Sequence, residues 1–183
     1  TGSHAATESD HAGDGFLAGL VTDWEQAATA NAGRDTRVVL LRTAPVLSPK
    51  GGLLAKLRPI FRLGLGGPIG DGKQYFSWIS LADEVRAIEF LLGSSISGPV
   101  NLSAPAPVPF GTFVDALGRS VHRPAFLPVP AFAARFVGGE MAEEMILFSQ
   151  RVTPKVLTDH GFTFTHPGVD EALAYATGST SHD

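Results

Sequence analysis

Apolar residues near the start of the chain recur at helical spacing. Seven of them lie three or four positions apart and form one stripe, which predicts an amphipathic helix. The stripe consists of Phe16, Leu17, Leu20, Val21, Trp24, Ala27 and Ala28. Asp14 is placed to cap the start of this helix and Gly33 to end it. We expect the stripe to pack against the rest of the protein.

The next patterned segment, residues 37–42, reads as a strand. It holds four consecutive apolar residues, of which Val38 and Val39 are β-branched. An uninterrupted apolar run predicts a strand buried on both faces, which is typical of a parallel sheet. A helix followed by such a strand is half of a β-α-β unit, so we expect a partner strand before residue 1 in a longer chain.

The middle of the chain alternates helices with glycine-rich loops. A helix is predicted over residues 53–65, although Pro59 is expected to kink or split it. Residues 64–72 are glycine-rich, and residues 75–79 read as a short strand. Ser80 followed three positions later by Asp83 is a capping pattern for a helix over residues 81–92. The predicted buried face of that helix contains Val85, Ile88 and Leu92.

The pattern changes after Gly93, where the elements become shorter. A strand is predicted over residues 99–103, and residues 104–109 are rich in proline. Helices are predicted at about 110–121, 129–138, 141–149 and 169–177. We therefore divide the chain into residues 1–93, the C-terminal part of a Rossmann-like unit with a substrate loop, and residues 94–183, a small substrate-side lobe.

Composition excludes several functional classes. The chain has no cysteine, so disulfides and thiolate chemistry are excluded. Its formal net charge of −4 gives no basic surface for nucleic acid. The six histidines show no metal-ligand spacing, so no metal site is predicted. No apolar run approaches the roughly 18 residues of a membrane span, and we expect a cytoplasmic protein.

Two segments together carry a family resemblance. Residues 41–49 form a loop at the end of the predicted buried strand, and residues 70–83 combine a glycine-rich turn, a glutamine, an aromatic strand and a capped helix. They resemble the NAD(P)-dependent epimerase/dehydratase family, or extended short-chain dehydrogenases/reductases. Other runs are similar to its "epimerase family protein" or nucleoside-diphosphate-sugar epimerase branch: Gly13-Asp14-Gly15-Phe16-Leu17-Ala18, Arg62-Leu63-Gly64-Leu65-Gly66-Gly67-Pro68-Ile69-Gly70, Gly98-Pro99-Val100-Asn101 and Ser149-Gln150-Arg151-Val152.

The resemblance implies a fold and a site. The fold would be α/β, the C-terminal half of a Rossmann-like parallel sheet with a small mixed α/β lobe. The cofactor would be NADP or NAD, its nicotinamide beside Pro45, Val46 and Leu47. The substrate side would contain Arg62, Gln74, Ser77 and Trp78, with Trp78 offering either a stacking face or a core side chain. Five basic residues would either hold a phosphate or form a solvated surface: Lys50, Lys56, Arg58, Arg62 and Lys73.

Three departures from the family pattern bear on function. The Gly-x-x-Gly-x-x-Gly turn that meets the pyrophosphate is absent from the chain. Leu17 and Val21 stand where the family has its catalytic tyrosine and lysine, and neither can transfer a proton. Phe76 stands where sugar-nucleotide epimerases have an arginine facing the diphosphate. The catalytic residues are therefore unknown.

Two functional hypotheses follow. The first is an epimerase/dehydratase-like oxidoreductase that acts on an unknown small molecule and lacks its dinucleotide-binding half in this chain. The second is an inactive pseudo-enzyme that serves as a ligand sensor or a protein-interaction module. Under either hypothesis the strand at 37–42 has an open edge, so we expect self-association or pairing with the missing N-terminal segment.

Overall fold

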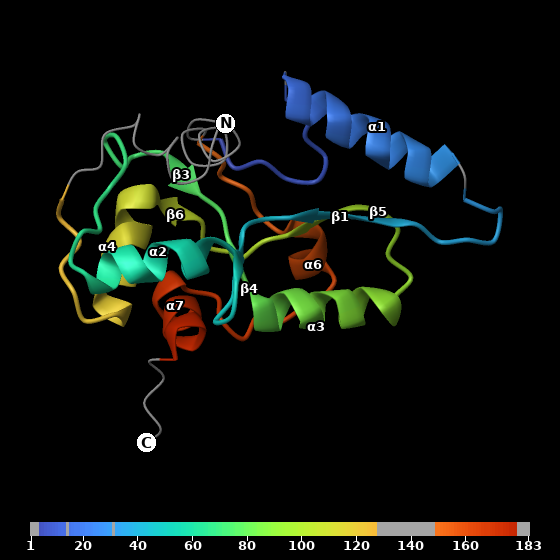
Figure 1. The fold of residues 1–183 in the computed structure, drawn as a ribbon. Coiled ribbons are helices and arrows are strands. Elements are labelled where there is room, and N and C mark those ends of the chain that lie inside the picture. The colour runs from blue at the N-terminus through green and yellow to red at the C-terminus, as the bar shows by residue number, and fades with distance from the viewer. Residues whose placement is uncertain (1–3, 14, 31, 128–148, 179–183) are drawn as a thin grey trace.

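The computed structural model describes residues 4–13, 15–30, 32–127 and 149–178 (Figure 1). Its elements follow the alternation of an α/β protein, with every strand short. In chain order they are α1 Phe16–Ala30, β1 Val39–Thr43, β2 Val46–Leu47, α2 Gly52–Arg62, β3 Tyr75–Phe76, β4 Ile79–Ser80, α3 Leu81–Leu92, β5 Gly98–Leu102, β6 Val108–Pro109, α4 Phe110–Ser120, α6 Lys155–Asp159 and α7 Val169–Thr177.

Strands β1 and β5 form the central parallel pair, with Val39 opposite Gly98 and Thr43 opposite Leu102. Figure 1 shows α1 on one side of this pair and α3 on the other. The parallel pairing confirms the predicted fold class. The expected burial of β1 on both faces is wrong, because Leu41 is 43% exposed and β1 has a strand neighbour on only one side among the described residues.

Helix α1 forms where the pattern predicts it, but it buries none of its residues. Phe16 is 81% exposed and Trp24 is 65% exposed, so the expected packing of the apolar stripe is wrong for this structure. Helix α1 is joined to β1 through a polar contact, an ion pair of Glu25 with Arg42 at 2.7 Å. The helix ends at Ala30, before Gly33, and the proposed cap Asp14 lies outside the described residues.

The strand expected over residues 75–79 is two separate strands. Tyr75–Phe76 pairs antiparallel with β6, whereas Ile79–Ser80 pairs parallel with β2. The break falls at Ser77 and Trp78, whose polar atoms bond to other segments: the Ser77 hydroxyl to residues 150 and 152, and the Trp78 carbonyl to the N–H of Ala104. The sequence predicts one strand here, but pairing with two different partners divides it.

Helix α2 ends at Arg62, earlier than expected, and contains Pro59 within its length. The glycine-rich turn follows, and Gly72 has a positive φ of 67°. A Cβ atom at Gly72 would lie 3.2 Å from the Cα of Gly111, whose N–H donates to the Gly72 carbonyl at 2.9 Å. Both the backbone conformation and this close approach therefore favour glycine at the position.

The start of α3 is confirmed: Ser80 caps it by accepting the Asp83 N–H at 3.1 Å. Its predicted buried face is wrong at Val85 and Leu92, which are 48% and 74% exposed, whereas Ile88 is partly buried against the core. The fully buried apolar positions of the helix are Ala87 and Leu91. The segment 155–159 is a helix that the pattern did not predict.

The remaining C-terminal expectations divide into three groups. Helices α4 and α7 and strand β5 are confirmed close to their predicted bounds. The helices expected at 129–138 and 141–149 fall outside the described residues, apart from Ser149. The division of the chain at residue 93 stays a prediction, and β5 from the second part pairs with β1 from the first.

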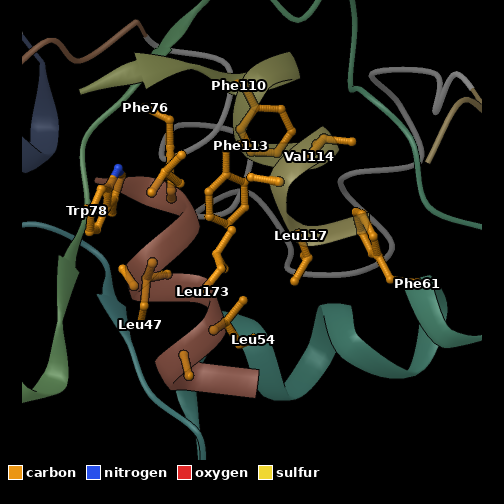
Figure 2. Packing of buried hydrophobic residues seen from close by; sticks show 14 of the residues in the cluster. Leu47, Leu54, Phe61, Phe76, Trp78, Phe110, Phe113, Val114, Leu117 and Leu173 are labelled. Atoms are coloured by element: carbon orange, nitrogen blue, oxygen red, sulfur yellow. The ribbon is translucent and has the colours of Figure 1, made fainter. Parts of the chain in front are cut away.

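Two apolar clusters form the core. One packs α3 and α6 against strands β4 and β5 and includes Ile79, Leu91, Val100 and Leu157. The other gathers side chains from α2, α4, α7 and the strands between them (Figure 2). Its large members are Leu47, Leu54, Phe61, Phe76, Trp78, Phe110, Phe113, Leu117 and Leu173. No helix of the described chain is long and apolar enough to cross a lipid bilayer.

Candidate functional site

The predicted cofactor loop and the predicted substrate strand meet at the carboxyl ends of β1 and β5. The N–H of Ala44 donates to the Leu102 carbonyl at 3.0 Å, and the N–H of Ile79 donates to the Pro45 carbonyl at 3.1 Å. The N–H of Ala104 donates to the Trp78 carbonyl at 2.6 Å. Ligands of open α/β sheets bind at this end of the strands, so this is the candidate site.

The three predicted cofactor contacts, Pro45, Val46 and Leu47, lie at this strand end but differ in exposure. Val46 and Leu47 form β2, which pairs with β4. Leu47 is fully buried in the larger core cluster, so its side chain faces the core and cannot also line a ligand site. Pro45 and Val46 are half-buried, and their role beside a nicotinamide stays a prediction.

Ser77 and Trp78 are both buried at the same strand end. The Ser77 hydroxyl donates to the carbonyl of Gln150 at 2.8 Å and accepts the N–H of Val152 at 2.9 Å. Trp78 is fully buried among core side chains (Figure 2), so neither face of its ring is open for stacking. In this structure Ser77 holds the segment 150–152 in place, and Trp78 packs the core.

Arg62 and Gln74 flank the glycine-rich turn of residues 64–72. Gln74 Nε2 donates to the Ile69 carbonyl at 3.2 Å, which braces the turn from within. Arg62 is exposed at the end of α2, where its carbonyl accepts Arg123 Nε at 3.1 Å. The structure thus brings Ser77 and Trp78 to the strand ends, while Gln74 supports the turn.

The five basic residues near the turn do not form one cluster of converging cations. Arg58 donates to the carbonyls of Pro49 at 3.3 Å and Thr177 at 3.1 Å, which ties α2 to the end of α7. Lys50, Lys56 and Lys73 are exposed. The Arg58 guanidinium is therefore already hydrogen-bonded to backbone carbonyls. Phosphate binding by the five basic residues stays a prediction.

Asp83 is the most highly bonded carboxylate of the described chain, and the sequence showed only its place in a capping pattern. Its two oxygens accept the N–H groups of Thr165 at 2.7 Å and His166 at 2.8 Å, Arg86 Nη1 at 2.9 Å and the Ser80 hydroxyl at 3.2 Å. Burial pushes the pKa of Asp83 up, but these hydrogen bonds outweigh it and lower the pKa. The residue fastens α3 to the segment 165–166.

Ser80, His166 and Asp83 have the residue types of a hydrolase triad. The Ser80 hydroxyl lies 3.0 Å from His166 Nδ1, and Asp83 lies 3.8 Å from the same nitrogen. Ser80 is fully buried, however, and the same histidine nitrogen faces both partners. A nucleophilic serine must be reachable by its substrate, and in a working triad the two imidazole nitrogens serve different partners. The group is therefore a structural clamp.

Glu84, beside this clamp, is a titratable residue that sequence reasoning missed. Its Oε1 accepts the Thr43 hydroxyl at 3.1 Å, at the carboxyl end of β1. Burial raises the pKa of Glu84 above its ordinary value, and the hydrogen bond from Thr43 opposes only part of that effect. The contact joins residues 41 positions apart, so no local pattern indicated it.

Comparison with known proteins places this chain among longer ones. The family described as "Domain of unknown function (DUF1731)" matches residues 129–176. The chain is 49% identical over 178 residues to Epimerase family protein Mb2239 of Mycobacterium bovis, covering 97% of this chain and 59% of that protein. It is 47% identical to Epimerase family protein ML0860 of Mycobacterium leprae, covering 100% of this chain and 60% of that protein.

Solved structures agree with these sequence relatives. Human epimerase family protein SDR39U1 (isoform 2) with NADPH matches with a TM-score of 0.90 and 33% identity, over 97% of this chain and 61% of that one. The nucleoside-diphosphate sugar epimerase of Corynebacterium glutamicum matches with a TM-score of 0.76 and 32% identity, over 98% of this chain and 34% of that one. The chain spans about 60% of the length of the curated mycobacterial relatives it matches. Over almost all of its own length, the chain is therefore similar in sequence and in fold to the proteins named epimerase family proteins.

Proposed function

We propose that this chain forms the substrate side and the nicotinamide-side loop of an NAD(P)-dependent oxidoreductase or epimerase acting on a small molecule. The observation that carries the proposal is the TM-score of 0.90, at 33% identity, to a relative whose structure contains NADPH. The candidate site lies at the carboxyl ends of β1 and β5, where that class of fold binds its ligands. NADPH is therefore the first cofactor to test, ahead of NAD.

The residues at the strand ends fit a nicotinamide ring on chemical grounds. Pro45 and Val46 are half-buried apolar side chains suited to one face of a flat ring. A bound nicotinamide would supply or accept hydride. The role of the chain is to orient the ring and the substrate and to exclude water.

The residue types at two positions of α1 favour a second candidate function, a ligand sensor without catalysis. Leu17 and Val21 occupy the positions of the family's tyrosine and lysine, and both are partly exposed on a helix that offers no proton donor there. General acid–base catalysis needs a titratable group within reach of the reacting atom. Binding without turnover would be the signature of this alternative.

Dinucleotide binding tests the proposal directly. We expect a chain extended to the full length of its mycobacterial relatives to bind NADPH with a Kd of about 10 μM or below, measured by nicotinamide fluorescence and calorimetry. The 183-residue chain alone is expected to show no binding at about 100 μM. No binding by the extended chain would overturn the proposed function, and binding without turnover of carbonyl or sugar-nucleotide substrates would favour the sensor.

The open edge of β1 leads to a further expectation about assembly. Its backbone groups on the side away from β5 have no strand partner among the described residues, and such an edge recruits other strands. We propose that the edge pairs with a second copy or with a segment such as the longer relatives carry. Light scattering of the isolated chain should give a mass above that of the 19.2 kDa monomer, and Leu41→Lys should reduce the excess. A clean monomer would contradict this expectation.

A further inference from the structure

An open concavity of about 470 Å³ lies where the chain folds back at the end of α4. Its volume falls in the range of about 300–1,000 Å³ that is usual for small-molecule sites. It is lined by Asp115, Gly118, Arg119, His122, Arg123, Pro124 and Ala125. None of these residues belongs to β1, β5 or the loop between β1 and β2, so the concavity is formed by other residues than the candidate site at the strand ends.

The backbone of this turn adopts a conformation that favours glycine, yet it carries a histidine. His122 has a φ of 56°, and it is the one described residue other than glycine with a positive φ. The N–H of Arg123 donates to the Gly118 carbonyl at 2.9 Å, which closes the turn after the helix. Glycine would fit position 122 with less strain, because it has no Cβ. The histidine instead places an imidazole in the wall of the concavity, and no described residue bonds to that side chain.

The guanidinium of Arg123 is held in place by backbone carbonyls. Its Nε donates to the Arg62 carbonyl at 3.1 Å, and its Nη1 donates to the His122 carbonyl at 3.4 Å. No group of the described chain accepts a hydrogen bond from its Nη2. A guanidinium fixed in this way loses little freedom when it binds an anion. Arg119 adds a second guanidinium, which Asp170 of α7 contacts at 2.6 Å.

Asp115 is the acidic residue of the concavity. It stands four positions before Arg119 on α4, a spacing at which oppositely charged side chains of a helix can pair. Arg119 binds Asp170 instead, so the Asp115 carboxylate has no partner among the residues that the structure describes. An ionised carboxylate only accepts hydrogen bonds, and a ligand hydroxyl can donate one. The concavity thus combines donors for an anion with an acceptor for a hydroxyl group.

We propose that this concavity binds a small phosphomonoester that carries a hydroxyl group. Arg123, Arg119 and His122 donate to the phosphate oxygens, and Asp115 accepts the hydroxyl. Three donor side chains suit a tetrahedral phosphate, which has more acceptor oxygens than a carboxylate, and guanidinium groups bind phosphate through paired hydrogen bonds. No covalent bond forms or breaks, so the site binds a ligand and is not a second active site.

Two phosphate esters with three carbons each test the hydroxyl contact. Calorimetry of the full-length protein should give a Kd of about 1 mM or below for glycerol 3-phosphate. Propyl phosphate, which lacks the hydroxyls, should bind about fivefold more weakly, because one hydrogen bond to a charged group is lost. Asp115→Ala should reduce this ratio to about twofold or less. Asp35→Ala, at an exposed aspartate elsewhere in the chain, should leave the ratio unchanged.

His122→Gly separates binding from folding. Glycine adopts the positive φ without strain, so the Tm should stay the same or rise. Loss of the imidazole should nevertheless weaken the binding of both esters by about fivefold. Arg123→Ala should abolish detectable binding, and Arg123→Lys, which keeps the charge without the planar fork, should weaken it and serves as the test if the alanine variant does not fold. Arg34→Ala, at an exposed arginine outside the concavity, should bind both esters as the wild type does.

The result that would overturn the inference is binding of neither ester by the wild type at about 10 mM, or unchanged affinities in His122→Gly. Equal affinities of the wild type for the two esters would also overturn it, because hydroxyl recognition by Asp115 is part of the proposal. The inference does not rest on the proposed function, so His122→Gly should bind NADPH as the wild type does. A parallel loss of NADPH affinity would overturn it as well, because the two ligands would then share one site.

Discussion

Replacing Asp83 with alanine is expected to lower the free energy of unfolding by about 3 kcal/mol, because a buried carboxylate and its hydrogen bonds to Thr165, His166 and Arg86 are lost. The variant would leave the N–H groups of Thr165 and His166 without the acceptor that the buried Asp83 provides. It would also release Arg86, which holds Asp83 at 2.9 Å. Urea unfolding followed by circular dichroism measures the change. Asp115→Ala, at an exposed site on α4, should shift stability by no more than about 0.5 kcal/mol.

The pH dependence of stability follows from the same residue. The folded pKa of Asp83 lies below its unfolded value, because the hydrogen bonds outweigh the burial that pushes the pKa up. The stabilisation is therefore fully present above the unfolded pKa, near 4, and is lost as pH falls through the folded pKa. Asp83→Asn should weaken this acid-side loss. Parallel stability curves for the wild type and the variant between about pH 2 and pH 5 would contradict the assignment.

Elements defined by local signals could be predicted from the sequence. The start of α3 depends on Ser80 and on the N–H of a residue three positions away, so the capping pattern was sufficient. The bounds of α4, α7 and β5 likewise follow from nearby periodicity and turn residues. The motifs of the glycine-rich turn also carried the family resemblance, and Gly64, Gly70 and Gly72 of this turn have the positive φ that favours glycine.

The contacts of the candidate site depend on residues far apart in the sequence. Asp83 binds N–H groups 82 and 83 positions away, and Ser77 binds segments 73 and 75 positions away. A motif places such residues near a ligand, but it does not tell which way a side chain points. For this reason Trp78 remained open between a stacking face and a core position, which the structure shows to be fully buried.

Helix α1 also shows what a local sequence pattern can and cannot predict. Its apolar stripe predicts a partner surface, and the period of the stripe is correct because the segment is helical. What covers the stripe is a tertiary property, and no described residue buries it. One contact that ties α1 to β1, between Glu25 and Arg42, joins two polar residues that hydrophobic patterning ignores.

Phe113→Ala is expected to destabilise the protein by about 3–5 kcal/mol, the cost of removing a fully buried phenylalanine and leaving a cavity. Phe113 is completely buried at the centre of the larger cluster, with its ring 4.7 Å from Phe76 and 5.8 Å from Phe110 (Figure 2). Leu173 of α7 lies in the same cluster, so the loss should also loosen the contact between α4 and α7. Chemical unfolding and amide hydrogen exchange in α7 measure both effects.

Phe16→Ala is the matched control, because it removes the same side chain from a site that is 81% exposed. Its cost in the isolated chain should be within about 0.5 kcal/mol, since little apolar surface is lost from contact. A cost close to that of Phe113→Ala would contradict the exposed position of α1. If that cost also fell on dilution, the stripe would be covered by a second copy, because only an intermolecular contact depends on protein concentration. Measuring both variants at two concentrations therefore separates packing within the chain from association between chains.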